Sequence, residues 1–143
     1  MMRALLDVNV LIALLDSAHI HHSQAMNWLS ANIAEGWASC PITQNGCIRI
    51  MSQPAYPNSR SPIEIASRLR EATLSAQHQF WADDASLLDA ELFDWQHLFN
   101  ARQLTDAYLL ALATQHSGVF VTFEHAVPLR AVAGAGMEHV ILI

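Results

Sequence analysis

Residues 1–16 read Met-Met-Arg-Ala-Leu-Leu-Asp-Val-Asn-Val-Leu-Ile-Ala-Leu-Leu-Asp, and this stretch decides the fold class. A short apolar run, residues 4–6, ends at Asp7, and a longer apolar run, residues 10–15, begins two residues later. The short run is typical of a buried strand in a parallel sheet, which is hydrophobic throughout. The longer run is rich in Leu and Ala and favours a helix. Asp7 is therefore predicted to lie between a strand and a helix, at the sheet edge where open α/β proteins bind ligands.

A carboxylate in such a turn also has a purely structural interpretation. Asp7 or Asn9 can cap the helix, because both side chains accept hydrogen bonds from the free amide groups at a helix start. Caps are commoner than catalytic carboxylates, so this stretch alone favours a cap. The functional interpretation depends on the rest of the chain.

The composition narrows the class of protein. A chain of 143 residues is expected to form a single domain, residues 1–143. No apolar run approaches the ~20 residues of a membrane span. The N-terminal apolar stretch is interrupted by Asp7 and Asn9, which argues against a signal peptide. Cys40 and Cys47 are too few for a disulfide scaffold, so a cytoplasmic location is expected.

All seven basic residues are Arg, and the chain contains no Lys. A P-loop requires a lysine on its phosphates, and a Schiff-base enzyme requires a lysine nucleophile. A phosphoacceptor receiver domain also relies on a lysine, so these three classes are excluded. The net charge of −6 argues against passive nucleic-acid binding, which needs a basic surface. It allows a nuclease whose carboxylates hold divalent cations, because the cations then supply the positive charge.

The remaining sequence alternates predicted strands and helices. Strands are predicted at residues 4–6, 37–40, 78–82, 119–123 and 140–143. Helices are predicted at residues 10–15, 19–33, 41–51, 63–74, 86–92, 104–116 and 127–132, with a loop at 52–62 and a short helix or turn at 94–100. Thr105 is expected to cap the helix at 104–116. Gly46 lies inside a predicted helix, where it costs about 1 kcal/mol against Ala and suggests close backbone approach. The alternation predicts an α/β fold with a central, mostly parallel sheet of about four or five strands.

Three acidic residues are predicted to meet at one edge of this sheet. Asp7 and Glu124 each follow a strand, and Asp106 lies in the first turn of a helix. Strand carboxyl ends and helix amino ends share an edge of a parallel sheet, so these carboxylates can converge. Such clusters are held by hard divalent cations such as Mg²⁺ or Mn²⁺. Carboxylate-held metals are suited to phosphodiester hydrolysis.

Other polar residues favour structural interpretations. His19 and His22 have a spacing that could suit a metal, but no third ligand is evident, so packing or hydrogen bonding is expected. A stretch of acids is interpreted as a solvated face, and it comprises Asp83, Asp84, Asp89, Glu91 and Asp94.

Four motifs, the first of them in two segments, carry a family resemblance. They read Leu-Leu-Asp-Val-Asn-Val-Leu with His-x-x-His-x-x-Ala-x-x-Trp-Leu (5–11 and 19–29), Thr-Gln-Asn-Gly-x-x-Arg-Ile (43–50), Leu-Thr-Asp-Ala (104–107) and Val-Thr-Phe-Glu (121–124). Together they resemble the motifs of PIN-domain ribonucleases, and above all those of the VapC toxins of bacterial toxin–antitoxin pairs. The resemblance spans nearly the whole chain. No single segment is very specific, but the four are specific together because they stand in the family's order.

The resemblance implies a PIN-like three-layer α/β/α domain that cleaves RNA with Mg²⁺ or Mn²⁺ and is neutralised by a VapB-like antitoxin. Asp7, Asp106 and Glu124 would coordinate the metal. Gln44 would occupy a fourth catalytic position where the family often has Glu, and Glu124 stands where the motif commonly ends in Asp. An amide brings no charge and cannot act as a general base. The residues implied to position water, carboxylates or substrate are Asn9, Thr43, Arg49, Thr105 and Thr122.

Several alternatives stay open from the sequence. Gln44 and the acidic net charge suggest a PIN fold that binds RNA or protein without cutting. A metal-dependent phosphohydrolase with a small-molecule substrate is a weaker alternative. Arg49 could contact phosphate or antitoxin, or form a structural ion pair. The chain has more apolar side chains than a small monomer must bury, and its four tryptophans are among them: Trp28, Trp37, Trp81 and Trp95. Exposed apolar patches usually mark partner surfaces, so a homodimer and a groove for an antitoxin segment are predicted.

Overall fold

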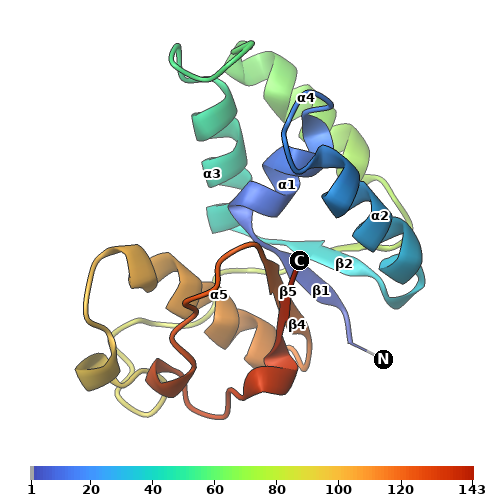
Figure 1. The fold of residues 1–143 in the computed structure, drawn as a ribbon. Coiled ribbons are helices and arrows are strands. Elements are labelled where there is room, and N and C mark those ends of the chain that lie inside the picture. The colour runs from blue at the N-terminus through green and yellow to red at the C-terminus, as the bar shows by residue number, and fades with distance from the viewer. Residues whose placement is uncertain (1) are drawn as a thin grey trace.

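The computed structural model describes residues 2–143, in which short strands alternate with helices (Figure 1). The strands are β1 (Ala4–Leu6), β2 (Trp37–Ser39), β3 (His78–Phe80), β4 (Val119–Thr122) and β5 (Val140–Leu142). The α-helices are α1 (Val8–Leu15), α2 (His22–Asn32), α3 (Pro41–Met51), α4 (Pro62–Thr73) and α5 (Arg102–Gln115). Single 3₁₀ turns follow at η1 (Ile33–Glu35), η2 (Trp95–His97), η3 (Leu129–Ala131) and η4 (Met137–His139). No helix within residues 2–143 has the length and apolar character needed to cross a bilayer.

The five strands form one parallel sheet in the order β3-β2-β1-β4-β5. This arrangement confirms the predicted α/β fold class with a parallel sheet. β1 lies at the centre, and the chain builds outward from it first toward β3 and later toward β5. Leu6 pairs with Val121, so the residues that follow β1 and β4 leave the sheet side by side. The reversal of strand order beside β1 is where open α/β sheets place their ligand sites.

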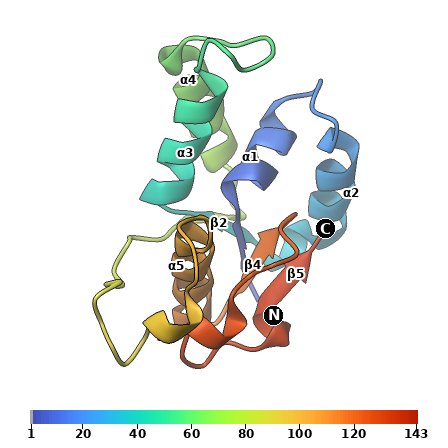
Figure 2. The same cartoon turned by 60° about the vertical axis from the view of Figure 1, so that its left-hand side comes forward.

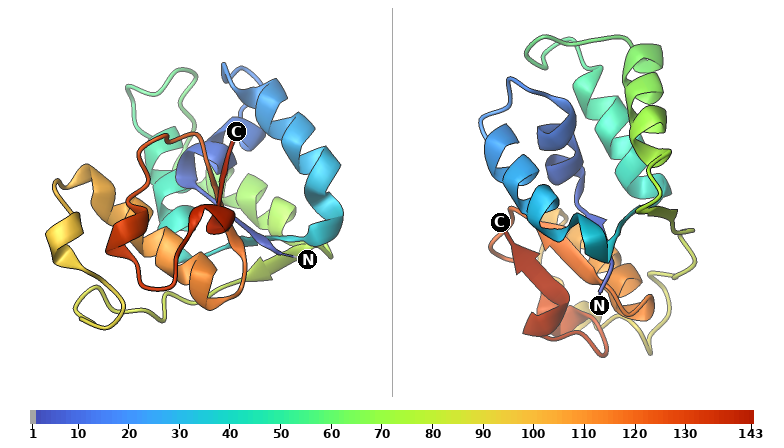
Figure 3. Two further views of the ribbon diagram at one scale, coloured as in Figure 1. Left: turned by 60° about the horizontal axis from the view of Figure 1, so that its bottom comes forward. Right: turned by 90° about the vertical axis from the view of Figure 1, so that its right-hand side faces the viewer.

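Alternating side chains of the sheet pack against two different helical layers. Leu5 and Phe120 pack with α5 on one face, whereas Ala4, Leu6 and Val121 pack on the other face with α1, α3 and α4. Figures 1 and 2 show α5 alone below the sheet and α1–α4 above it. The two further views in Figure 3 show the same three layers. Because successive side chains of a strand point to opposite faces of the sheet, both faces are covered by helices, which gives the α/β/α architecture.

Three local predictions are wrong. The helix expected at residues 127–132 is only the 3₁₀ turn η3. Residues 86–92 form turns and not a helix, since Ser86 and Asp89 side chains accept hydrogen bonds from nearby backbone amides at 3.2 and 3.0 Å. Such local hydrogen bonds compete with helix formation. The helix predicted at 104–116 begins earlier, at Arg102, whose backbone N–H donates to the Asn100 side chain at 3.0 Å. Thr105 is therefore not a cap, and Asp106 lies in the second turn of α5.

Candidate active site

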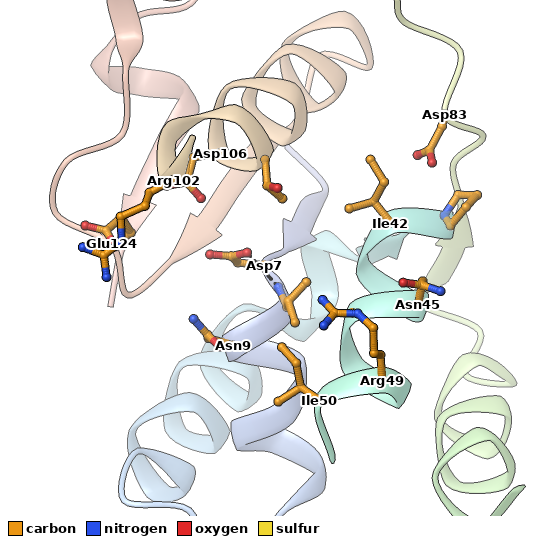
Figure 4. Close-up of a pocket in the computed structure, with 14 residues that line it drawn as sticks. Asp7, Asn9, Ile42, Asn45, Arg49, Ile50, Asp83, Arg102, Asp106 and Glu124 are labelled. Carbon is orange, nitrogen blue, oxygen red and sulfur yellow. Dashed lines mark hydrogen bonds between the residues drawn. The ribbon is translucent and has the colours of Figure 1, made fainter. Parts of the chain in front are cut away.

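The carboxyl ends of β1 and β4 open into a pocket of about 540 Å³ between α1, α3 and α5 (Figure 4). Asp7, Asp106 and Glu124 all line it, so the three acids predicted to converge do share one cavity. Their elements are far apart in sequence, and the pairing of β1 with β4 brings them together. The other residues that line this acid pocket are Val8, Asn9, Pro41, Ile42, Asn45, Gly46, Arg49, Ile50, Asp83, Arg102 and Thr105.

Asp7 both caps α1 and faces the pocket. Its Oδ1 accepts a hydrogen bond from the Val8 backbone at 2.8 Å, and its Oδ2 accepts one from the Thr122 hydroxyl at 2.7 Å. Burial raises the pKa of Asp7 above its ordinary value, while the Thr122 and Val8 hydrogen bonds oppose that rise and the charge of Glu124 adds to it. The structural and functional interpretations of Asp7 are therefore compatible, because the two carboxylate oxygens have different partners.

Thr122 connects two of the acids. Besides donating to Asp7, its Oγ1 accepts a hydrogen bond from the Glu124 backbone N–H at 3.0 Å. The Thr122 side chain is fully buried, so it has little freedom to turn away. One hydroxyl therefore fixes the Asp7 carboxylate and the turn that carries Glu124.

Asp106 is half-buried on α5 and faces the same cavity. Burial, followed by the negative charges of Asp7 and Glu124, raises the pKa of Asp106 to about 7. Both charge effects arise because Asp7 and Glu124 lie close to Asp106 in the structure. Glu124 is exposed, and its Oε1 accepts a hydrogen bond from the Ala126 backbone at 3.3 Å.

The carboxylates of the pocket are the ligand type that a hard divalent cation prefers, but their side chains are not arranged around a common point. Within residues 2–143, no three His, Cys, Asp or Glu side chains are arranged to hold one ion together. The three acids share the cavity but are not grouped around one point in these side-chain positions, so their shared metal site stays a prediction. Mg²⁺, however, is usually held by one or two carboxylates, several waters and substrate phosphate. Crowded carboxylate oxygens with raised pKa values match that kind of site.

Gln44 does not reach the acid pocket. Its Nε2 donates a hydrogen bond to the Ser39 hydroxyl at 3.0 Å, and its side chain lines a separate surface pocket beside Arg70 and Thr73 of α4. The positions of α3 that face the acids are Ile42, Asn45, Gly46, Arg49 and Ile50. A helix advances about 100° per residue, so Gln44 lies on a different face. The prediction of a fourth site position at Gln44 is corrected by this placement.

Thr43 also has a structural role. Its buried hydroxyl accepts a hydrogen bond from the Cys40 backbone N–H at 3.0 Å and donates to the Cys40 carbonyl at 3.1 Å, at the start of α3. It does not line the acid pocket. Asn9 and Thr105 do line the pocket, where both are exposed to solvent.

Three polar or charged pocket residues, Asn45, Asp83 and Arg102, were not singled out as site residues from the sequence. Asn45 precedes Arg49 by four positions and Arg102 precedes Asp106 by four, so helical spacing could have identified both. Asp83 enters from the connection after β3, which no local pattern places there. Asp83 was interpreted as part of a solvated face, yet it is half-buried and its Oδ1 has no hydrogen-bond partner among residues 2–143.

The positive charges and histidines near the site have distinct roles. Arg49 and Arg102 both line the pocket; Arg49 points toward its centre, whereas Arg102 lies beside Glu124 at its edge (Figure 4). Neither makes an ion pair within the described chain. The ion-pair alternative for Arg49 is therefore not observed. His22 Nδ1 lies 2.7 Å from the Ala13 carbonyl, and His19 Nδ1 accepts a hydrogen bond from the His21 backbone at 3.0 Å. These two histidines form hydrogen bonds, as the sequence predicts.

Comparison with known proteins agrees with this geometry. The PIN domain family matches residues 4–134. In Mycobacterium tuberculosis (strain ATCC 25618 / H37Rv), Ribonuclease VapC44 is 50% identical over 138 residues, which cover 96% of this chain and 97% of that protein. Ribonuclease VapC39 of the same strain is 41% identical over 134 residues, 93% of this chain and 96% of that protein. Because these matches span nearly the whole chain, this chain belongs to the PIN-domain family as a VapC-like ribonuclease.

Proposed function

We propose that this PIN-domain ribonuclease is an endoribonuclease toxin that uses Mg²⁺ or Mn²⁺ and is neutralised by a cognate VapB-like antitoxin. One observation carries the proposal. Asp7, Asp106 and Glu124 come from three separate parts of the chain and line one pocket. Burial of Asp106 and the negative charges of the other two acids raise the pKa of Asp106 to about 7. A cluster of this kind is stabilised by a cation and is suited to phosphodiester hydrolysis.

Asp7, Asp106 and Glu124 are the residues that would hold the ion. When bound, such an ion supplies positive charge opposite the scissile phosphate and a polarised water. Thr122 holds the Asp7 carboxylate in a fixed orientation through a 2.7 Å hydrogen bond. Arg49 and Arg102 border the pocket and can contact phosphate oxygens. Without an ion, Asp106 keeps its proton at mildly acidic pH, so the metal-free site reaches its full negative charge only above about pH 7.

The direct test is RNA cleavage by the purified, antitoxin-free protein. We expect cleavage with Mg²⁺ or Mn²⁺, loss of cleavage in EDTA, and a loss of at least about a hundredfold in Asp7→Asn, because a ligand and its charge are removed. Asp84→Asn is a matched control, since Asp84 is exposed and lies outside the acid pocket. The absence of metal-dependent cleavage, with Asp7→Asn equal to wild type, would rule the proposal out.

A non-cutting PIN module that binds RNA or protein is the second candidate. Gln44 does not support this candidate, because its side chain does not line the acid pocket and so does not replace an acidic side chain there. It now depends on the finding that no three potential ligands are arranged around one point within residues 2–143. Calorimetry with Mn²⁺ separates the candidates. Absent Mn²⁺ binding together with retained RNA binding would favour the module.

The antitoxin is proposed to lie in an apolar groove of about 260 Å³ between α1, α2 and α4. Apolar side chains line it, including Leu14, Leu15, Met26, Leu29 and Ile33. Met26 is 40% exposed at this groove, so it is available to a partner. We expect Met26→Glu to weaken inhibition of cleavage by the co-purified antitoxin, while Ile63→Glu, at an exposed position outside the groove, leaves inhibition intact. Equal inhibition of both variants would contradict this placement.

The homodimer also stays a proposal, but three of the four tryptophans that suggested it are buried or half-buried within the single chain. Trp37 and Trp81 are 5% and 3% exposed, so the single chain buries both, and Trp28 is half-buried. Trp95 alone is largely open, at 47%. A monodisperse monomer in light scattering would contradict the dimer. The single domain over residues 1–143 and the cytoplasmic location are likewise predictions from the sequence.

A further inference from the structure

A second pocket is lined by residues that neighbour those of the acid pocket along the chain. We call it the Phe99 pocket; it has a volume of about 520 Å³ and is lined by His97, Phe99, Gln103, residues 126–129 and Arg130. Two consecutive residues of α5 line one cavity each: Arg102 lines the acid pocket and Gln103 lines the Phe99 pocket. On the segment after β4, Glu124 lines the acid pocket and Ala126, two residues later, lines the Phe99 pocket. A ligand chain in one cavity can therefore continue into the other.

Phe99 presents its ring to solvent at this second pocket. Its side chain is 76% exposed, so the ring contributes little to the core. Its backbone N–H donates a 2.8 Å hydrogen bond to the Gln103 side chain, which ties the backbone at Phe99 to the start of α5. The His97 ring lies edge-on to it, with ring centroids 6.5 Å apart. An open aromatic face can stack with a flat ligand such as a nucleobase.

The charges around Phe99 favour an anionic ligand. Arg130 lines the Phe99 pocket, Arg102 lines the acid pocket beside it, and neither makes an ion pair with an acidic side chain in the part of the chain that the structure describes. His97 is paired with Asp94 at 3.6 Å, which leaves the arginines as the cations available to phosphate. An exposed aromatic ring next to unpaired arginines is the combination that binds single-stranded nucleic acid.

We infer that the Phe99 pocket binds a nucleotide of single-stranded RNA adjacent to the bond that is cut, with its base stacked on Phe99 and its phosphate at Arg130. The inference rests on the proposed ribonuclease function, because the scissile phosphate then lies in the acid pocket. Stacking on a ring tolerates any base, so this subsite strengthens binding without setting a strict sequence. A protein partner would account for the open ring, but it would not account for the continuity with the acids.

The test compares RNA affinity in matched pairs of variants. In the Asp7→Asn background, with Mg²⁺ present, binding of a fluorescently labelled single-stranded RNA of roughly 12 nucleotides is followed by anisotropy. Phe99→Ala should weaken binding about tenfold and Phe99→Trp should restore it. Arg130→Ala should weaken binding and flatten its dependence on salt. The controls are Phe80→Ala and Arg68→Ala, exposed residues outside both pockets, and they should bind as the parent does.

Steady-state cleavage with the intact acid pocket separates the possible failures. Phe99→Ala should raise KM about tenfold, with a much smaller change in kcat, because stacking stabilises the bound substrate and the transition state alike. If the unmodified protein cleaves RNA with metal but Phe99→Ala and Arg130→Ala keep its KM, this inference alone is overturned. If Phe99→Ala changes only the oligomeric state or the antitoxin affinity, the ring is a protein contact and the inference is also overturned. Absence of metal-dependent cleavage by the unmodified protein overturns the proposed function itself.

Discussion

The hydroxyl of Thr122 shows how much one side chain decides at this site. It donates to Asp7 at 2.7 Å and accepts from the Glu124 backbone at 3.0 Å, so it uses both its proton and a lone pair. Asp7 is only 6% exposed, and its Oδ2 would lose this partner if the hydroxyl were removed. An unsatisfied buried carboxylate oxygen is costly, so the hydroxyl stabilises both the fold and the charged form of Asp7.

Thr122→Val should therefore lower stability and activity together. Valine has nearly the same shape, so the main change is the loss of the two hydrogen bonds. We expect the free energy of unfolding in urea to fall by about 1–3 kcal/mol. RNA cleavage should fall as well, because Asp7 is no longer oriented. Thr122→Ser keeps the hydroxyl and is the control. A valine variant as active and as stable as the serine variant would contradict this role.

Asp106 should make the metal-free protein less stable at higher pH. Its pKa rises from 3.8 to about 7 in the folded state, so between these values the folded state binds more protons than the unfolded state. Stability contributed by this group is thus lost as pH rises toward 7. In EDTA, Asp106→Asn should remove this loss and stabilise the protein by about 1 kcal/mol at about pH 8, after allowance for solvent screening. Urea unfolding at about pH 5 and about pH 8 checks the sign, and a variant that is less stable than wild type at the higher pH would contradict it.

At the scale of elements, α3 lies close to the start of α1, and Gly46 is the residue that permits it. A Cβ at position 46 would lie 2.7 Å from Val8 Cγ2 and 3.1 Å from Val8 Cγ1. Val8 directly follows Asp7, so the contact sets how near α3 approaches the acid pocket. The close backbone approach predicted for this glycine from the sequence is therefore confirmed.

Gly46→Ala should be destabilising although alanine is the better helix former. The gain in helix propensity is about 1 kcal/mol, whereas forcing α3 away from the stiff, branched Val8 costs about 1–3 kcal/mol. A lower melting temperature and weaker cleavage are expected. The double variant with Val8→Ala should recover stability, since it makes room for the new methyl group. A stabilised single variant would show that the helices separate freely.

At the scale of the whole molecule, the acid pocket lies where the two helical layers meet the sheet edge. Asp7 begins α1 on one side of the sheet, and Asp106 belongs to α5, which covers the other side. An ion held by both residues would connect the layers. It would therefore stabilise the folded state by an amount that grows with the logarithm of its concentration, once that concentration exceeds its dissociation constant.

Manganese should raise the melting temperature of the wild-type protein in a concentration-dependent way. An ion concentration about a hundred times its dissociation constant adds about 2.7 kcal/mol to the free energy of unfolding. Asp7→Asn and Asp106→Asn should each lose most of this shift, whereas Asp84→Asn keeps it. Equal shifts in all four proteins would mean that manganese binds elsewhere.

The sequence by itself determined the order of the strands and helices and the position of Asp7 at the end of β1. These features follow from short apolar runs and helical spacing, which are local properties of the chain. It also indicated that Asp106 and Glu124 would share an edge with Asp7, because all strands of such a sheet run in parallel. Local pattern failed at residues 86–92, where side chains compete for the backbone amides.

Only the tertiary structure decided which side chains enter the acid pocket. Gln44 turns away and Asn45 turns inward, because the packing of α3 against α1 and α4 sets the rotation of the helix. Asp83 reaches the pocket through the path of an irregular connection that has no repeating pattern. The meeting of the Phe99 pocket with the acids depends on α5 and the segment after β4, which lie together only in the folded chain. Short-range spacing specifies elements, whereas long-range packing specifies their rotation and neighbours, and the chemistry of the site depends on both.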